Sequence, residues 1–523
     1  MPTSVRRCLC LALAAWLLLC AELLPSVPLT PWQSATLQAQ ITITPGRKGS
    51  SRKAAVDKPQ RINWQVIVLD NTRIGYARNL TQQTTRNGRA IVRTVSDTYL
   101  TIKRFGQTLR METLLETEET PKGELLTFVL EIRNPPASTS RTSGRVEGTQ
   151  LVLESSVGGA KTERSTLWDR DVKSPAFQDR WLRTSRMKPG ESRTTKVYHP
   201  VQNKVVALTL TADQYERVEL FDGKNRNLLP VRIEMADLPR SLAYVDATGE
   251  ILKTEVDFLG KTMATYAVSE EVAIKEIAGE ELDIAVNTLV RVRPLPHGHG
   301  TKSAVYRITT PGKDSAELLP TGSTQAVKRI DSETLELTVT ALEVRDGPNS
   351  KPVDEQYLAP TRFLQCTDPR VAAHARKAAN GSTKPAETAI RMERYVLRNL
   401  NKKNFSTALA SAAEVANSLE GDCTEHAVLL AAMLRAAKIP SRIAIGLVYV
   451  ENLESFGGHM WTEAWLGGKW VPLDGTLGRG GIGAAHIKLA DSSLADDAPA
   501  PVTVFIPLMN VLGRMQIDVI KAE

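Results

Sequence analysis

The stretch that decides the fold of the C-terminal half is SAAEVANSLEGDCTEHAVLLAAMLRAAKIPSRIAIGLVYV, from Ser411 to Val450. It predicts a helical segment, a turn at Gly421 to Cys423, a second apolar helix that stops before Pro440, and a strand over residues 443–450. Asp422 is a good N-cap, so Cys423 falls in the first turn of the second helix. The unsatisfied N–H groups there favour a thiolate over a thiol. Cys423 is therefore a candidate nucleophile.

The next stretch, GGHMWTEAWLGGKWVPLD from Gly457 to Asp474, predicts two further strands joined by a turn at Gly467 and Gly468. Counting back from this turn, the hairpin register brings His459 and Asp474 close together. The carboxylate can then hold the imidazole, which leaves the other ring nitrogen for the thiol. Cys423, His459 and Asp474 therefore suggest a nucleophile, a base and an orienting acid.

These blocks, together with GTLGRGGIGAAHIKL at residues 475–489, resemble the transglutaminase-like superfamily of papain-type thiol enzymes, in an exported bacterial form. The resemblance covers residues 354–489 and implies an α+β catalytic domain with Cys423 as nucleophile, His459 as base and Asp474 as orienting acid. It also implies acyl-enzyme chemistry on amide bonds, with water or a Lys-type amine as the acceptor. The backbone N–H of Cys423 would serve the oxyanion hole.

A zinc site is the competing interpretation, because His426 follows Cys423 on the same helix and His459 and Asp474 could complete four ligands. A Cys-x2-His pair on one helix lacks the paired spacing of structural zinc sites, so we expect no metal and no cofactor. His426 is then expected to shape the pocket. The loop that holds His297 and His299 is expected to be solvated.

The chain before the catalytic segment alternates apolar and polar residues between turn signals, which predicts antiparallel β structure over residues 62–269 and a further β region over 270–350. Two motifs there, Ile74-Gly75-Tyr76 and the stretch from Tyr244 to Glu255, resemble the curved antiparallel sheets of envelope proteins of the lipoprotein-carrier type. This resemblance implies a concave binding surface. A spacer or a lid is the alternative. Residues 490–523 are expected to pack on the catalytic domain. The fold class is thus multidomain, with a mainly antiparallel β region before the α+β domain.

The N-terminus carries Arg6 and Arg7 before an apolar run from Cys8 to Leu24, which predicts a signal peptide over residues 1–39 or an uncleaved membrane anchor. Three of the five cysteines lie in this segment. Only Cys366, which we expect to be a buried small residue, and Cys423 remain, so a disulfide framework is excluded, although these two cysteines could still pair with each other. A basic linker follows over residues 40–61, where contact with the cell envelope is a second interpretation beside a solvated linker.

The charge balance of 66 Lys and Arg against 58 Asp and Glu gives +8, which is mild for 523 residues. A concentrated basic stripe is missing from the sequence, so we expect no nucleic-acid partner. The favoured function is an exported thiol enzyme that acts on protein or peptide amide bonds, in the periplasm or outside the cell. The alternative is a non-catalytic envelope binding or scaffold protein whose Cys423, His459 and Asp474 are vestigial. The sequence does not determine the oligomeric state.

Overall fold

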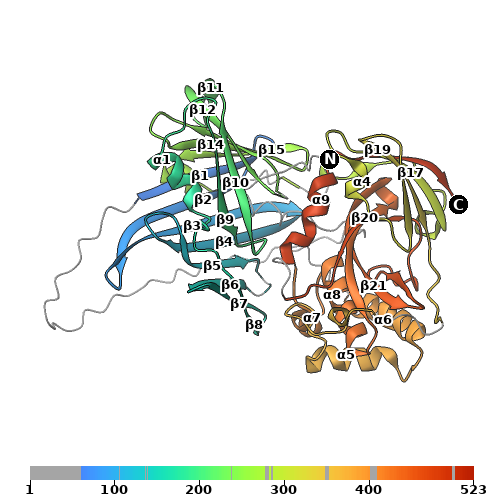
Figure 1. Cartoon of the computed structure of the whole chain (residues 1–523). Helices are drawn as coiled ribbons and strands as arrows, with labels where there is room; N and C mark the ends of the chain where they lie inside the picture. The colour runs from blue at the N-terminus through green and yellow to red at the C-terminus, as the bar shows by residue number, and fades with distance from the viewer. Residues whose placement is uncertain are drawn as a thin grey trace.

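The computed structural model describes residues 61–104, 106–135, 137, 139–236, 238–276, 282–283, 287–347, 353–400, 409–496 and 501–523. The predicted signal peptide and nearly all of the basic linker lie outside these residues. The described chain forms two halves that lie side by side, with the strands before residue 270 in one and the helices after residue 353 in the other (Figure 1).

The N-terminal half is a 15-stranded antiparallel sheet within the described residues, in the order β8-β7-β6-β5-β4-β3-β2-β1-β15-β14-β13-β12-β10-β9, with β11 paired to β12. The alternating sequence gives strands such as β3 and β4 one buried face, whereas β8 has no buried residue. The β2–β3 turn has Asn87 and Gly88 at φ 50° and 76°, as a type I′ hairpin requires. The strands are β1 (Arg61–Leu69), β2 (Thr72–Arg86), β3 (Arg89–Arg104), β4 (Gln107–Glu119), β5 (Leu125–Arg133), β6 (Ser140–Glu147), β7 (Gln150–Val157), β8 (Ala160–Leu167), β9 (Ser192–His199), β10 (Lys204–Ala212), β11 (Glu216–Glu219), β12 (Asn225–Met235), β13 (Ser241–Val245), β14 (Ile251–Phe258) and β15 (Lys261–Val268).

This sheet curls until its last strand approaches β5. Lys173 bridges the two, because its N–H donates to Lys196 O at 2.8 Å and its carbonyl accepts from Tyr198 N at 3.0 Å, while Leu125 N donates to Val172 O at 3.3 Å. The strands that follow one another in the sheet from β5 through β4 and β1 to β10 and β9 therefore enclose an interior. Helix α1 (Phe177–Thr184) follows the bridging segment. Strands β6 to β8 extend beyond the bridge.

The region after residue 270 joins the two halves. Its elements are α2 (Glu270–Ile274), β16 (Val290–Arg291), η2 (Gly298–Gly300), β17 (Ser303–Thr309), α4 (Ser315–Leu318), β18 (Gln325–Arg329) and β19 (Thr334–Thr340). β16 pairs with β21 (Ser455–Leu466) of the C-terminal half, and β17 to β19 form a 4-stranded sheet with the last described strand, β24 (Gln516–Ala522). Helix α9 (Ile506–Val511) contacts β20 (Ser441–Val450) and β23 (His486–Ser492), so the C-terminal segment packs partly on the C-terminal half and partly on this sheet.

The C-terminal half packs helices against a 5-stranded sheet formed by described residues, in the order β16-β21-β20-β23 with β22 paired to β21. Helix α8 is apolar on all sides and packs against the other helices and against β20 and β21, so it forms the centre of the core. The elements are η3 (Glu355–Tyr357), α5 (Pro369–Ala379), α6 (Pro385–Asn399), α7 (Ala412–Ser418), α8 (Cys423–Ala436), β20 (Ser441–Val450), η4 (Glu451–Leu453), β21 (Ser455–Leu466), β22 (Lys469–Leu473), β23 (His486–Ser492) and η5 (Pro501–Phe505).

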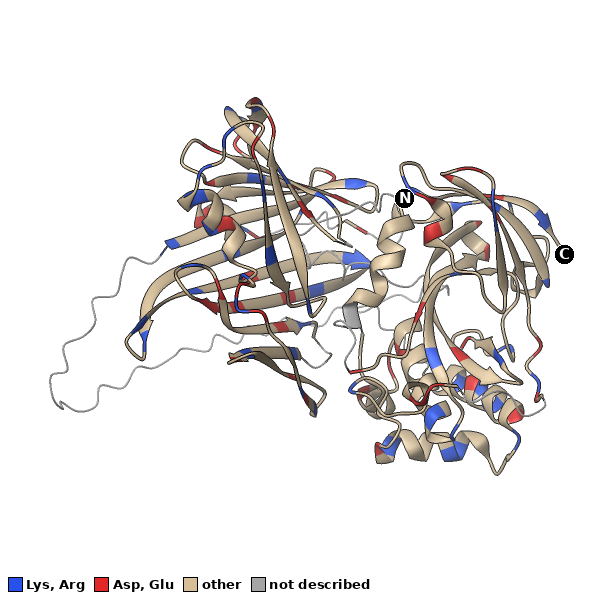
Figure 2. Cartoon of the chain, in the orientation of Figure 1, with Lys and Arg blue, Asp and Glu red and all other residues tan. Residues whose placement is uncertain are grey.

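The predicted order of helices and strands in this half is confirmed. The helical segment predicted before the Gly421 turn begins at Ala412, where Ser411 and Glu414 form a capping box. Acidic and basic residues are interspersed over both halves (Figure 2). Of the helices in the described chain, none has the length and apolar character needed to span a membrane.

Candidate active site

Cys423 is the first residue of α8 and is buried, at 1% exposure. Asp422 caps the helix, since its Oδ1 accepts from Thr424 N at 3.0 Å. Glu425 completes a capping box by accepting from Asp422 N at 3.0 Å. The predicted cap is therefore confirmed, and it places Cys423 at the positive end of a 14-residue helix.

Two contacts position the start of α8 against the hairpin of β21 and β22. Thr462 on β21 donates its hydroxyl to Ala427 O at 2.9 Å. Gly475 lies against His426, where a Cβ on the glycine would come within 3.5 Å of His426 Cβ and O. Cys423 is one helical turn before these two α8 residues, so it lies at the end of α8 that faces the segment after β22.

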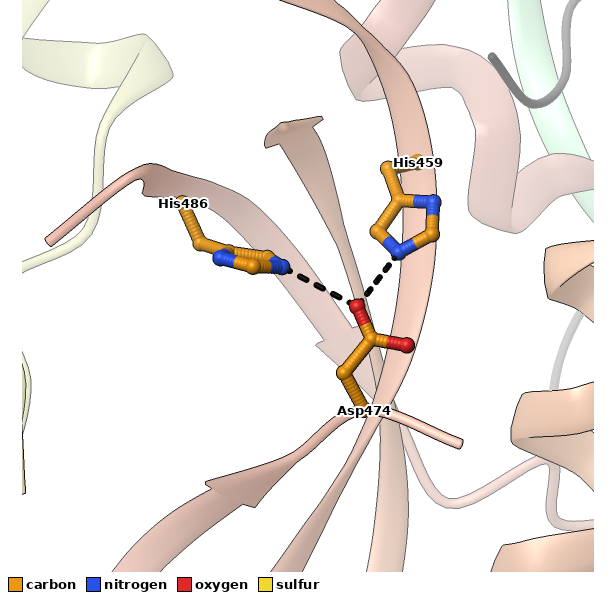
Figure 3. A group of neighbouring side chains, drawn as sticks. All are labelled: His459, Asp474 and His486. Carbon is orange, nitrogen blue, oxygen red and sulfur yellow. Dashed lines mark hydrogen bonds and ion pairs between the residues drawn. The ribbon is translucent and has the colours of Figure 1, made fainter. Parts of the chain in front are cut away.

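The predicted pairing of His459 and Asp474 is present. The hairpin pairs Leu466 with Lys469 and Thr462 with Leu473, so Asp474 continues β22 beside the His459 end of β21. His459 Nε2 lies 2.8 Å from Asp474 Oδ2, and both side chains are fully buried (Figure 3). This bond uses Nε2 as the donor and leaves Nδ1 as the ring nitrogen available for proton exchange. Trp461 stacks on the imidazole at 6.2 Å between ring centroids.

A second histidine, which the sequence analysis did not single out, also binds Asp474. His486 opens β23, and its Nε2 lies 3.1 Å from Asp474 Oδ2 (Figure 3). Burial would raise the pKa of Asp474, but the charge and hydrogen bond of His459 and the hydrogen bond of His486 hold it well below 3.8. The N–H and hydroxyl of Thr476 also donate to the other carboxylate oxygen. Asp474 is therefore an ionised acceptor at neutral pH.

Glu393 holds the backbone of the segment that carries Asp474. It lies on α6 with no exposed surface, and its carboxylate accepts from Asp474 N at 2.9 Å, Gly480 N at 2.5 Å and Gly481 N at 3.2 Å. Burial raises its pKa to about 7. A sequence signal existed, because Glu393 falls on the same helix face as the buried residues Ala389, Met392 and Val396.

The N-terminal half reaches the start of α8 through Arg104 at the end of β3. Arg104 Nη2 lies 2.6 Å from Asp422 Oδ2, and both residues are buried. The β7–β8 turn also meets this region, since a Cβ on Gly158 would lie 3.0 Å from Ser411 Oγ at the cap of α7. No local pattern identifies Arg104, because its partner is 318 residues away.

The other candidate residues have separate surroundings. The grouping of possible metal ligands in the described chain is His459, Asp474 and His486, rather than the predicted alternative with Cys423 and His426. Hydrogen bonds from both imidazoles to one carboxylate oxygen account for their closeness. His426 is buried, and its Nδ1 lies 2.6 Å from Asp422 O. Cys366 is buried as expected, and burial raises its pKa.

The expectation of a solvated loop at His297 and His299 is wrong for His299. This ring is only partly exposed and lies 5.8 Å from the ring of His486. Burial lowers the pKa of His299 to about 4, so the imidazole is neutral at pH 7. His299 therefore belongs to the packing behind Asp474 and His486.

The comparison with known families finds a match in the C-terminal half. Residues 372–475, which include Cys423, His459 and Asp474, match the transglutaminase-like superfamily. This segment is a transglutaminase-like domain. No curated protein matches the sequence of the chain.

Three solved structures resemble parts of the chain. A proposed cysteine protease from Cytophaga hutchinsonii has 18% identity and a TM-score of 0.27, over 42% of this chain and 85% of its own. A β-barrel-like protein of unknown function from Brucella abortus has 13% identity and a TM-score of 0.30, over 40% and 96%. The periplasmic domain of TgpA from Pseudomonas aeruginosa has 15% identity and a TM-score of 0.20, over 34% and 91%.

Proposed function

We propose that the chain is an exported thiol enzyme that acts on amide bonds of proteins or peptides through an acyl-enzyme at Cys423. The observation that carries this proposal is the buried His459–Asp474 pair at 2.8 Å, next to the helix end that holds Cys423. A histidine oriented by an ionised carboxylate beside a thiol at a helix N-terminus is the arrangement that thiol acyl transfer requires.

The chemistry follows from the roles of these groups. His459 Nδ1 takes the thiol proton while Cys423 Sγ attacks the amide carbonyl carbon. The backbone N–H of Cys423 stabilises the oxyanion that forms. Collapse of this intermediate breaks the C–N bond, and the imidazolium gives its proton to the leaving amine. Water or a primary amine then attacks the thioester, and Cys423 is regenerated.

Asp474 supports both proton transfers by position and charge. Its hydrogen bond fixes the ring tautomer with the proton on Nε2, and its ionised state stabilises the imidazolium formed when His459 accepts the thiol proton. His486 and Thr476 donate to Asp474 and keep it ionised. Because these groups are buried, their interactions are weakly screened.

The deciding experiment is mass spectrometry of the reduced full-length protein after exposure to a Gln-containing peptide, with and without a primary amine. Transamidation is supported if the peptide gains the mass of the amine minus the mass of ammonia and this gain depends on Cys423. Deamidation or chain cleavage supports hydrolysis. Cys423→Ala is the matched control. If wild type and Cys423→Ala give identical spectra over a panel of peptides and no thioester is trapped, the non-catalytic envelope protein becomes the better description.

Export is proposed from the sequence alone, because Arg6 and Arg7 precede the apolar run from Cys8 to Leu24. Cell fractionation tests it. The full-length chain is expected in the envelope or medium, and deletion of residues 2–39 is expected to leave it in the cytoplasm. Equal distribution of both forms would contradict export by this segment.

A further inference from the structure

The interior of the curled N-terminal sheet contains a cavity of about 240 Å³. Alternate residues of β1 to β4 face it, such as Thr94, Ser96 and Thr98 on β3, and the opposite wall comes from β9, β10, β12, β14 and β15. Residues of α1 border it on another side. The exposed Arg61 is one of the lining residues, so the cavity reaches solvent there.

Apolar atoms make up most of the cavity surface, and many uncharged polar side chains are set among them. They supply hydroxyls and amides, and they are Asn63, Gln65, Asn79, Thr81, Thr94, Ser96, Thr98, Thr113, Thr117, Gln178, Thr254 and Thr265. Aliphatic contacts come from Ile67, Leu115, Leu208 and Met235. A cavity for acyl chains would present a continuous aliphatic wall, so this composition favours a ligand that makes hydrogen bonds.

Two buried polar groups on the wall have no partner among the described residues. His199 Nδ1 accepts from Gln202 N at 3.0 Å, which assigns the ring proton to Nε2. Burial lowers the pKa of His199 to about 3, so the ring is neutral and Nε2–H is a donor. This Nε2 and the hydroxyl of Thr117 lack hydrogen bonds, although His199 and Thr117 are only 2% and 1% exposed. Buried donors of this kind are normally satisfied.

The charged residues of the lining are Arg61, Asp179, Arg180 and Arg183, and burial raises the pKa of Asp179. Arg180 pairs with Glu119 at 2.6 Å, and Arg61 pairs with Glu250. Burial raises the pKa of the Glu119 carboxyl, so added negative charge is unfavourable there. An uncharged ligand with a hydrogen-bond acceptor therefore fits this site better than an anion.

We propose that the interior of the N-terminal sheet binds a small uncharged ligand through an amide carbonyl that accepts hydrogen bonds from His199 and Thr117. The methyl or methylene groups of such a ligand would lie on the aliphatic part of the wall. An N-acetylated sugar and a short peptide segment both carry this group. The site is independent of the thiol chemistry proposed for Cys423.

Isothermal titration calorimetry of the full-length protein tests the proposal with three probes: N-acetylglucosamine, N-acetylalanine methylamide and octanoate. Saturable binding of one acetamide probe is expected, and the probe that binds identifies the source as sugar or peptide. Thr117→Val keeps the side-chain shape and His199→Asn keeps an acceptor for Gln202 N, so each removes one donor. Each is expected to weaken binding about tenfold, whereas Thr108→Val, outside the cavity on the same strand as Thr117, leaves it unchanged.

The proposal is overturned if neither acetamide probe binds, if only octanoate binds, or if both donor variants bind like wild type. Should His199→Asn fail to fold, Thr117→Val and the ¹⁵N shift of His199 Nε2 in wild-type protein give the same answer. A shift of that signal on saturation with the probe supports the contact, and an unmoved signal contradicts it.

Discussion

Arg104 and Asp422 form a buried ion pair that joins the two halves of the protein at the helix of the candidate nucleophile. Their side chains are 1% and 2% exposed, and 2.6 Å separates Arg104 Nη2 from Asp422 Oδ2. Asp422 also caps α8 through Thr424 N. The N-terminal half therefore contributes directly to the position and electrostatics of Cys423.

Arg104→Ala is expected to destabilise the protein by about 3–5 kcal/mol, because the Asp422 carboxylate remains buried without its partner. Urea unfolding measures this loss, and the alkylation rate of Cys423 is expected to change with it. Arg110→Ala, an exposed residue just past the same hairpin turn, serves as the control. The double variant Arg104→Met/Asp422→Asn should recover much of the stability, since it leaves no unpaired charge. If Arg104→Ala has the same free energy of unfolding as wild type, the ion pair contributes nothing to stability.

Cys423→Ala and His459→Ala are expected to abolish turnover, whereas Asp474→Asn should fold and retain residual activity. The asparagine NH2 must face either the two imidazoles or the donors of Thr476, so one of these sets of hydrogen bonds is lost, and kcat should fall on the order of 10³–10⁴-fold. Glu463→Gln is a matched carboxylate control on β21. Glu463 pairs with Arg442 and with Lys488, at 2.7 Å in each case. Steady-state kinetics on the substrate found by mass spectrometry decide the point, and equal activity of Asp474→Asn and wild type would reassign the orienting role.

His486→Phe is expected to lower kcat less than His459→Ala does, since it removes one of the donors to Asp474 and leaves the His459 bond in place. Loss of this donor raises the pKa of Asp474, because the hydrogen bond of His486 favours the ionised form. The acidic limb of the pH–rate profile should move to higher pH as a result. A profile identical to wild type would mean that His486 only packs behind the site.

Glu393→Gln is expected to change how stability depends on pH. The folded pKa of Glu393 is about 7, above the unfolded value of about 4.3, so its contribution is full below pH 4.3 and is lost as pH rises through 7. Between pH 5 and 7 the stability of wild type relative to Glu393→Gln should fall by about 1 kcal/mol per pH unit. Urea unfolding of both proteins across this range measures the difference. A constant difference would place the pKa of Glu393 at its ordinary value.

The sequence pattern places a domain boundary near residues 346–349, which predicts that a fragment of residues 354–523 folds alone. The structure gives a different expectation, since this fragment lacks β17, the partner of β24, and β16, the partner of β21. A fragment of residues 287–523 restores both pairings but still lacks Arg104. We expect the longer fragment to be soluble and less stable than the full chain, and the shorter one to aggregate. A cooperative unfolding transition in the shorter fragment, measured by circular dichroism, would contradict this.

The sequence by itself determined the features that depend on neighbours in the chain. A cap acts over one helical turn, so Asp422 predicts the place of Cys423. A two-residue turn determines the register of its hairpin, so Gly467 and Gly468 bring His459 to Asp474. Alternation of apolar and polar residues likewise predicted the antiparallel strands of the N-terminal half.

Only the tertiary structure decided which distant groups complete each site. Arg104, Glu393 and His486 reach the segments of Asp422 and Asp474 because separate elements pack against them, and a local pattern carries no information about that packing. The same is true of the cavity wall, where Thr117 and His199 face one interior only after the Lys173 bridge closes the curled sheet. Burial then assigns their chemistry, since it controls the pKa of His199 and makes each unpaired donor costly.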